Sequence, residues 1–243
     1  MLKITSFVPQ STPEISVIIP TLNEEAYISD TIRRLSDTQV SYEVIVVDAD
    51  STDSTVEIAK HCGAKVIATS KASRAHQMNT GAQIAKAEIF CFLHADTLPP
   101  SRFLDKISDQ VNSKRAEIGC FRYKFDTDRK SLQFNAWCTR IPLMMFRGGD
   151  QSLFITRKYF DKLNGFDESM VVMEDYDIIR RGRQFTKFQI VPDYMLVSAR
   201  KYDHNSYVRV NLANFLVFSL FYLGVDSHRL KRLYYQLLRH PKE

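Results

Sequence analysis

Acidic residues follow two apolar runs at places where they could serve phosphate chemistry. Asp48 and Asp50 follow one run, and Asp96 follows the run IFCFL with His94 two residues before it. A carboxylate at such a tip could hold a hard cation between two phosphates, because magnesium and manganese take oxygen ligands and leave positions for substrate. A lone aspartate after a strand also serves as a helix cap or turn residue. Asp53 suits a helix dipole, so Asp48 and Asp50 are the better ligand candidates.

A third acidic segment, VVMEDYDIIRRGR, places Glu174 and Asp175 ahead of several arginines. Acids at a helix start and bases at its end are explained in large part by the helix dipole. A neighbouring acid pair in a pocket could instead supply a general base. Proton transfer at Asp175 is therefore the second chemistry that the residue types permit.

Two further segments carry groups suited to a nucleotide. PTLNEE includes Pro20, Thr21, Asn23 and Glu24 and offers turn N–H groups to a phosphate, although a capped helix start explains it equally well. Arg74 begins a helical pattern, where a cation opposes the helix dipole. That position favours a diphosphate or carboxylate partner over a surface ion pair.

The elements that must position these groups alternate in the first half of the chain. Short apolar runs predict strands at 15–20, 43–48, 65–69 and 89–93, with helical patterns between them. Asn23 is the expected cap of the first helix, Ser51 or Thr52 that of the second, and Gly63 its stop. Runs this short and apolar are typical of a parallel sheet covered on both faces, in which ligands lie at the carboxyl ends of the strands.

The second half is less regular and predicts a mixed α/β region that packs on the first. Helices are expected at 101–112, at 132–146 and after Glu174, with strands at 117–125 and 152–156. The region 132–151 is expected to face an acceptor, with Trp137 and Met144 as pocket walls, although core packing explains both residues equally well. The predicted organisation is a tail at 1–14, one domain at 15–205 divided into halves 15–98 and 99–205, and C-terminal helices at 206–243.

Composition narrows the class of protein. The 243 residues are 44% hydrophobic, which fits one sizeable core. The net charge of +5 is modest and fits either solubility or attraction to diphosphates or an anionic membrane surface, and no nucleic-acid partner is expected. The four cysteines show no CxxC spacing, and residues 1–10 show no secretory signal, so a cytoplasmic protein with reduced thiols is expected. The apolar segment 211–225 is shorter than the roughly 20 residues of a membrane span, which favours a buried helix, with peripheral membrane contact as the alternative.

Taken in order, these segments resemble glycosyltransferase family 2, whose members have the GT-A fold. The resemblance runs from about residue 15 to 183 and rests on PTLNE, VVDADSTDST, SRAHQMNTGA, FLHADT, GGDQSLF, GFDE and MED. SRAHQMNTGA, FLHADT and GGDQSLF look more narrowly like a bacterial subgroup in which HAD replaces the family's DXD motif. Two departures stand out: Ala49 replaces a second acid after Asp48, and His94 replaces the first acid of DXD.

The resemblance implies a metal-dependent, inverting transfer from a nucleoside-diphosphate sugar, with UDP as the expected nucleotide, to a hydroxyl acceptor such as a sugar, a lipid or another small molecule. It implies Mn²⁺ or Mg²⁺ as cofactor and a cytoplasmic site, at the inner face of the membrane where the acceptor is a glycolipid or cell-envelope precursor. The implied residues are Asp175 with Glu174 for catalysis; Pro20, Thr21, Asn23, Glu24, Asp48, Asp50, Arg74 and Asp96 for the donor; Gly149, Asp150 and Gln151 for the acceptor; and Asp96 for the metal, with His94 as a weaker candidate.

Two other functions compete with this interpretation. A catalytically silent nucleotide-sugar or polysaccharide-binding module would explain the thinned acidic motifs, but the retention of Asp96 and Asp175 argues against it. A sugar-phosphate nucleotidyltransferase would need a glycine-rich, basic loop after the first strand, and PTLNEE is not such a loop.

Overall fold

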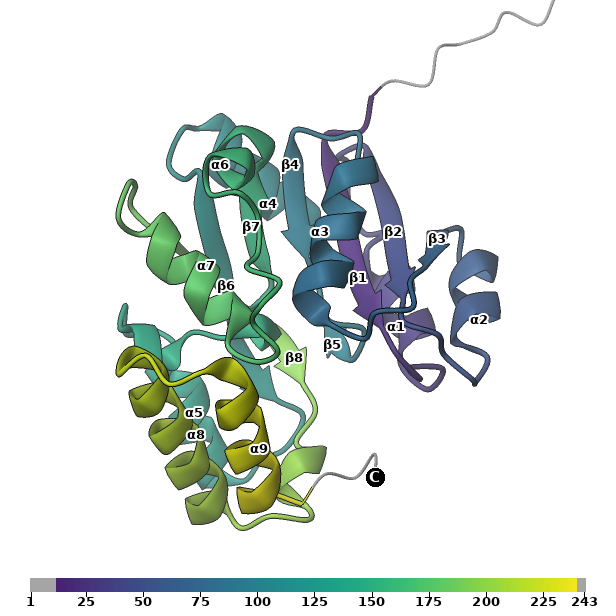
Figure 1. Cartoon of the computed structure of the whole chain (residues 1–243). Helices are drawn as coiled ribbons and strands as arrows, with labels where there is room; N and C mark the ends of the chain where they lie inside the picture. Colours follow the sequence, from purple (N-terminus) through teal and green to yellow (C-terminus); the bar gives the residue numbers. More distant parts are fainter. Residues whose placement is uncertain (1–11, 240–243) are drawn as a thin grey trace, which may run out of the picture.

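The computed structural model describes residues 12–239, so most of the predicted tail, and the segment 1–10 without a secretory signal, lie outside the described residues. Its strands form one mixed sheet in the order β3-β2-β1-β4-β7-β6-β8-β5 (Figure 1). The strands are β1 Ile15–Thr21, β2 Tyr42–Asp48, β3 Lys65–Ala68, β4 Ile89–Phe92, β5 Thr97–Leu98, β6 Ile118–Phe125, β7 Leu153–Thr156 and β8 Gln189–Val197.

The first four long strands are parallel, as their apolar runs predict. All seven residues of β1 are buried, because helices cover both of its faces. The chain leaves β1 toward β2 and β3 on one side and returns to β4 on the other. A switch of this kind opens a crevice at the carboxyl ends of the strands. Beyond β4 the sheet becomes mixed, since β7 is antiparallel to both β4 and β6.

Helices form a layer on each face of the sheet. One face packs against α1 Ile28–Arg34, α2 Thr55–His61 and α4 Phe103–Asn112. The other packs against α3 Arg74–Ile84, α6 Arg157–Lys162 and α7 Glu174–Gly182. Gly81 allows α3 to approach β1 closely, because a Cβ at that position would collide with the side chain of Ile18. The buried Gln77 then donates hydrogen bonds to the carbonyls of Thr21 and Val47, which fixes α3 over the ends of β1 and β2.

The remaining elements lie beside the second half of the sheet. α5 Lys130–Cys138 packs on β6, and α8 Tyr207–Tyr222 and α9 Ser227–Leu237 form an antiparallel pair next to it (Figure 1). Short 3₁₀ turns occur at Met144–Phe146, Gly149–Gln151 and Arg200–Tyr202. Within residues 12–239, no helix is long and apolar enough to cross a membrane.

Several predicted boundaries are wrong for physical reasons. Asn23 does not cap α1, which begins at Ile28 after a turn, because the Asn23 amide oxygen accepts the Thr52 N–H from the neighbouring loop. Neither Ser51 nor Thr52 caps α2, which follows Ser54 without a side-chain cap. The helix predicted at 132–146 ends at Cys138 and continues as a loop and a 3₁₀ turn. Gly63 does follow α2, with φ of +85°, as expected for a helix stop.

Candidate active site

The edge formed by the ends of β1 and β2 is closed by internal hydrogen bonds. Asp48 is 2% exposed, and its carboxylate accepts bonds from the Thr21 hydroxyl at 2.9 Å and from the backbone and hydroxyl of Ser51 at 2.8 and 2.6 Å. A carboxylate with its lone pairs used in this way braces the loop after β2. Pro20 and Thr21 are also buried, and the Thr21 carbonyl accepts from the Gln77 side chain and the Ala49 N–H.

The loops beyond this edge are more open. Asp50 is exposed and has a positive φ of 66°, which turns the chain sharply after β2. Asn23 lies opposite it and bonds the 51–52 turn, while the Glu24 N–H donates to the hydroxyl of Thr55. These contacts join the two loops into one rim, at the position expected for a nucleobase.

Arg74 lies at the start of α3 and faces the acidic side of the site. Its Nη1 is 3.6 Å from Glu174 Oε1. Burial works against its charge, but Glu174, Asp175, Asp150 and Asp96 together raise the pKa of the guanidinium. The Arg74 side chain is 59% exposed, so the guanidinium stays positive at the open side of these four carboxylates, and its role in binding a ligand stays a prediction.

Asp96 forms an ion pair that the sequence does not signal. Arg200 Nη2 lies 2.5 Å from Asp96 Oδ2, and the Arg200 guanidinium stacks 4.6 Å from the centre of the Tyr27 ring. The partners are 104 residues apart, and Arg200 stands in a basic loop of ordinary composition. The sequence draws attention to the segment SARKYDHNS, with Arg200, Lys201 and His204 after an apparent strand, but a solvated basic loop explains it equally well and nothing there indicates Asp96 as the partner.

His94, the loop at Gly149 and the start of α7 meet at one point. His94 Nδ1 is 3.2 Å from Asp150 Oδ1, and a Cβ on Gly149 would collide with both His94 and Asp175. Burial opposes the charge of His94, but the Asp150 hydrogen bond raises the pKa of the imidazole overall. The Asp150 side chain is 54% exposed, so burial opposes its charge only in part, and the same bond lowers the pKa of its carboxyl.

Asp175 has the most perturbed environment of these acids. It is 7% exposed, it adjoins the buried Glu174, and the structure gives its carboxylate no hydrogen-bond donor within residues 12–239. Burial and then the charge of Glu174 raise the pKa of Asp175 to about 6. A carboxylate with this pKa is ionised at neutral pH and accepts a proton more readily than an ordinary aspartate.

The donor set for a metal ion is small. Among residues 12–239, no three His, Cys, Asp or Glu side chains are grouped so that they could hold an ion together. His94 already bonds Asp150 through Nδ1, whereas Asp96 is partly open and offers a hard oxygen beside Arg200. These residues fit an Mg²⁺ or Mn²⁺ ion held by one protein carboxylate, with the other ligands supplied by a diphosphate and water.

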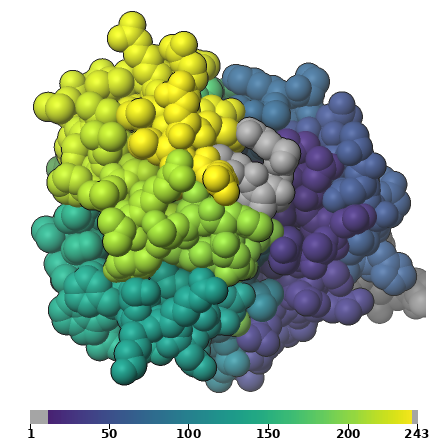
Figure 2. Space-filling view, turned by 90° about the horizontal axis from the view of Figure 1, so that it is seen from below, coloured from purple at the N-terminus to yellow at the C-terminus, as the bar shows by residue number. Residues whose placement is uncertain are grey.

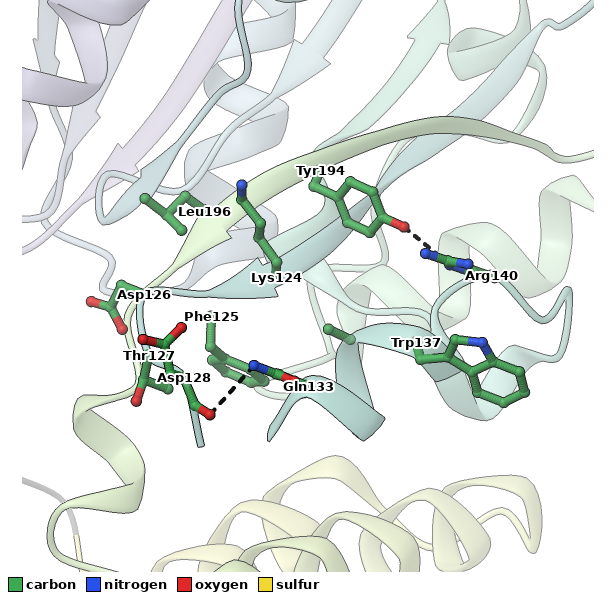
Figure 3. A pocket seen from close by; sticks show the side chains of 11 residues that line it. Lys124, Phe125, Asp126, Thr127, Asp128, Gln133, Trp137, Arg140, Tyr194 and Leu196 are labelled. Atoms are coloured by element: carbon green, nitrogen blue, oxygen red, sulfur yellow. Dashed lines mark hydrogen bonds between the residues drawn. The ribbon is translucent and has the colours of Figure 1, made fainter. Parts of the chain in front are cut away.

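The predicted acceptor segment divides into three parts. Gln151 is fully buried and donates to the Phe146 carbonyl at 2.7 Å, so its side chain supports the loop from beneath. Asp150 and Gly149 face the site. Met144 packs against the core, whereas Trp137 lines a hollow of about 650 Å³ between α5 and the ends of β6 and β8, seen in Figure 3.

The fold is that of the GT-A glycosyltransferases, and sequence comparison agrees. The model of the family described as "Glycosyl transferase family 2" matches residues 16–171. The chain therefore belongs to glycosyl transferase family 2. An uncharacterized glycosyltransferase of Rickettsia typhi is 28% identical over 183 residues, or 69% of this chain and 58% of the relative. The chain spans 25%, 27% and 58% of the lengths of three curated relatives that it matches.

Two solved structures support the fold. The mannosyltransferase PcManGT of Pyrobaculum calidifontis, in complex with GDP-Man and Mn²⁺, has a TM-score of 0.64 and 21% identity, covering 86% of this chain and 63% of the other. TarS of S. aureus, in complex with UDP, has a TM-score of 0.62 and 15% identity, covering 92% and 70%. The prediction of a GT-A fold is confirmed. The family match ends at residue 171, so it does not include Asp175.

Proposed function

We propose that this chain transfers a sugar from a nucleoside-diphosphate sugar, with UDP as the expected nucleotide, to a hydroxyl acceptor with inversion at the anomeric carbon. The observation that carries the proposal is the buried Asp175, whose pKa is raised to about 6 where the loop at Gly149 meets His94. Such a group suits a general base at neutral pH. Acceptor groups that enter beside Gly149 and Asp150 would lie next to it.

The donor would lie along the rim from Asn23 to Asp50, with its diphosphate toward Arg74. Arg74 and Arg200 provide two positive charges beside Asp96, which suits a leaving group that gains charge. A Mg²⁺ or Mn²⁺ ion held by Asp96 would supply further charge neutralisation there. The UDP complex of TarS and the Mn²⁺ and GDP-Man complex of PcManGT support this choice of donor and cofactor.

The reaction follows from these positions as a single displacement. The acceptor oxygen attacks the anomeric carbon while the bond from that carbon to the diphosphate oxygen breaks, and the acceptor proton passes to a carboxylate oxygen of Asp175. Arg74, between Glu174 and the expected diphosphate, stabilises charge on the departing nucleotide. We place the acceptor among bacterial cell-envelope or glycolipid precursors on the cytoplasmic side, in keeping with the relatives.

The test of the base compares Asp175→Asn with the wild type in nucleotide release from UDP-sugars in the presence of Mn²⁺. Loss of a general base should lower turnover about 10²–10⁴-fold. Calorimetry should find UDP binding nearly unchanged, and Asp161→Asn, at an exposed position on α6, should behave as wild type. Equal losses of UDP affinity and turnover in Asp175→Asn would contradict the assignment, and a wild type that binds UDP-sugars without turnover would favour the binding-module alternative.

The metal is tested separately at Asp96. Asp96→Ala and a chelator should each weaken UDP binding in Mn²⁺ buffer, and together they should weaken it no further than either alone. The metal proposal fails if calorimetry finds UDP affinity unaffected by both. Arg200→Lys is the companion variant, because it keeps the charge but loses the planar contact with Tyr27.

A further inference from the structure

Most of the large apolar side chains that are exposed among residues 12–239 lie in two segments, 134–145 and 208–223. Phe134 and Trp137 are 58% and 50% exposed on α5, and their rings stack with centroids 6.1 Å apart. On α8, the exposed residues recur at the spacing of one helix face. They are Val208, Leu212, Phe215, Leu216, Tyr222 and Leu223.

The two segments adjoin each other. Asn135 on α5 donates to Asn211 on α8 at 3.1 Å and accepts from the Tyr207 hydroxyl at 2.8 Å, so the helices lie side by side. The view from below in Figure 2 shows the teal region of α5 against the yellow-green region of α8. We call this surface, made by the exposed apolar residues of α5, α8 and the 143–145 turn, the apolar face.

Basic residues predominate around the apolar face, and the nearest exposed acids, Asp128, Asp203 and Asp226, lie just outside its segments, where Asp203 pairs with Arg129. Segments 129–149 and 204–225 contain no Asp or Glu. Lys130, Arg140 and Arg209 are exposed on these segments, and Arg183 joins them through a hydrogen bond to the Pro142 carbonyl beside Leu143. Exposed aromatic and aliphatic side chains bordered by Lys and Arg are the combination that binds an anionic lipid surface.

We propose that the apolar face docks on an anionic membrane surface, with α8 lying in the plane of the interface. A second copy of the chain fits less well, because a twofold contact would bring two predominantly basic borders together, with few acids to pair them. α8 has 16 residues and an exposed face that is apolar along its length, and interfacial helices of this kind bury one side by roughly 5–10 Å.

Docking in this orientation would bring the active site near the lipid. Gly149, beside Asp175, is four positions after Met145 on the apolar face, a reach of at most about 14 Å. α7, which begins with Glu174 and Asp175, is also joined to α8 by the Tyr176–Phe218 ring contact at 5.7 Å. A hydroxyl on a lipid head group would therefore be within reach of the proposed base.

The test is cosedimentation of the full chain with vesicles of phosphatidylcholine, alone or mixed with phosphatidylglycerol. The wild type should bind the mixed vesicles more tightly and lose binding in high salt. Leu212→Ser combined with Phe215→Ser should weaken binding more than about tenfold, because two exposed apolar anchors are removed. Phe185→Ser, an equally exposed phenylalanine that contacts Lys162 on α6, is the matched control and should bind as wild type.

A second pair of variants tests the charges. Lys130→Gln combined with Arg140→Gln should weaken binding to the mixed vesicles severalfold and leave binding to phosphatidylcholine unchanged. Wild type that stays in the supernatant, or a Leu212/Phe215 variant that binds as wild type, would overturn the proposal. If the wild type were a dimer and the Leu212→Ser, Phe215→Ser variant a monomer, the occupant of the apolar face would be a second copy of the chain and not a membrane. Nucleotide release without vesicles tests the transferase proposal independently.

Discussion

The candidate site contains two buried aspartates, one on each side, whose surroundings differ. On the donor side, Asp48 is 2% exposed and accepts three hydrogen bonds from Thr21 and Ser51. On the catalytic side, Asp175 is almost as buried, adjoins Glu174, and has its pKa raised to about 6 by burial and by that neighbour. Burial alone therefore does not mark a reactive carboxylate.

The difference lies in what surrounds the charge. Donors around Asp48 replace the water that folding removed, so the aspartate stabilises its loop. Asp175 accepts no such hydrogen bonds within residues 12–239. Burial and the charge of Glu174 outweigh the opposing charges of His94 and Arg74, so its affinity for a proton stays high, which costs stability and suits base catalysis. Hydrogen bonds to Asp48 thus stabilise the donor side, whereas the catalytic side keeps a carboxylate whose ionised form is unfavourable.

The largest expected effect comes from crowding the catalytic side. Gly149→Ala should lower turnover about 10²-fold or more, because a Cβ there would displace Asp175 and His94 from their present positions. Steady-state rates of nucleotide release measure it. The matched control is Gly148→Ala, since Gly148 has an extended φ of 167° and the atom nearest to its Cβ would be the Tyr176 hydroxyl at 3.8 Å. If both variants were equally active, close packing at Gly149 would not matter to the site.

The next effect is pH dependence. Because the pKa of Asp175 is raised to about 6, kcat/KM should fall about tenfold per unit as pH drops below that value and level off above it. Rates measured between pH 4.5 and 8 would follow the fall. In Asp175→Asn the small residual rate should lose this limb, and a limb that persisted there would belong to another group.

Much of this arrangement could be predicted from the sequence. Polar residues placed directly after short apolar runs had to lie at one edge of a parallel sheet, which is where Asp48, His94 and Asp96 are found. Arg74 was expected to bind a ligand, because a cation at a helix start opposes the helix dipole; it lies next to Glu174, and its contact with a ligand stays a prediction.

The rest depends on contacts that no local pattern encodes. The Arg200–Asp96 pair joins residues 104 positions apart, and the two-residue strand β5 exists only because it pairs with β8. The Asn23 amide was drawn from the helix start to the neighbouring loop by tertiary packing. The inward direction of Gln151 depends on the backbone turn around it.

Stability should separate the two aspartates that follow β2. Asp48→Ala should lower the free energy of unfolding by roughly 3–4 kcal/mol, because charge-assisted hydrogen bonds are lost and buried donors are left without partners. Asp50→Ala, at an exposed position two residues away, should change it little, apart from the effect at its positive φ. Urea denaturation measures both. A stable Asp48→Ala protein that had lost UDP binding would show that Asp48 serves the nucleotide more than the loop.

The smallest expected effect is on the free energy of unfolding, which should change in opposite directions when Asp175 and Asp150 are replaced by asparagine. The pKa of Asp175 is about 6 in the folded state and 3.8 in the unfolded state. The stability contributed by its protonated form is therefore full below pH 3.8 and is lost as pH rises through about 6. Asp175→Asn should therefore stabilise the fold at pH 7, on the order of 1–3 kcal/mol, and progressively less toward pH 4.

The pKa of Asp150 is lowered by its His94 bond, so its ionised form stabilises the fold above the unfolded pKa and loses that effect as pH falls through the folded one. Asp150→Asn should accordingly destabilise at pH 7, by less, because its side chain is 54% exposed. Urea denaturation of both variants at pH 4 and pH 7 compares the signs. The same sign for both at pH 7 would mean that the contrast between a compensated and an uncompensated carboxylate does not hold within the catalytic side.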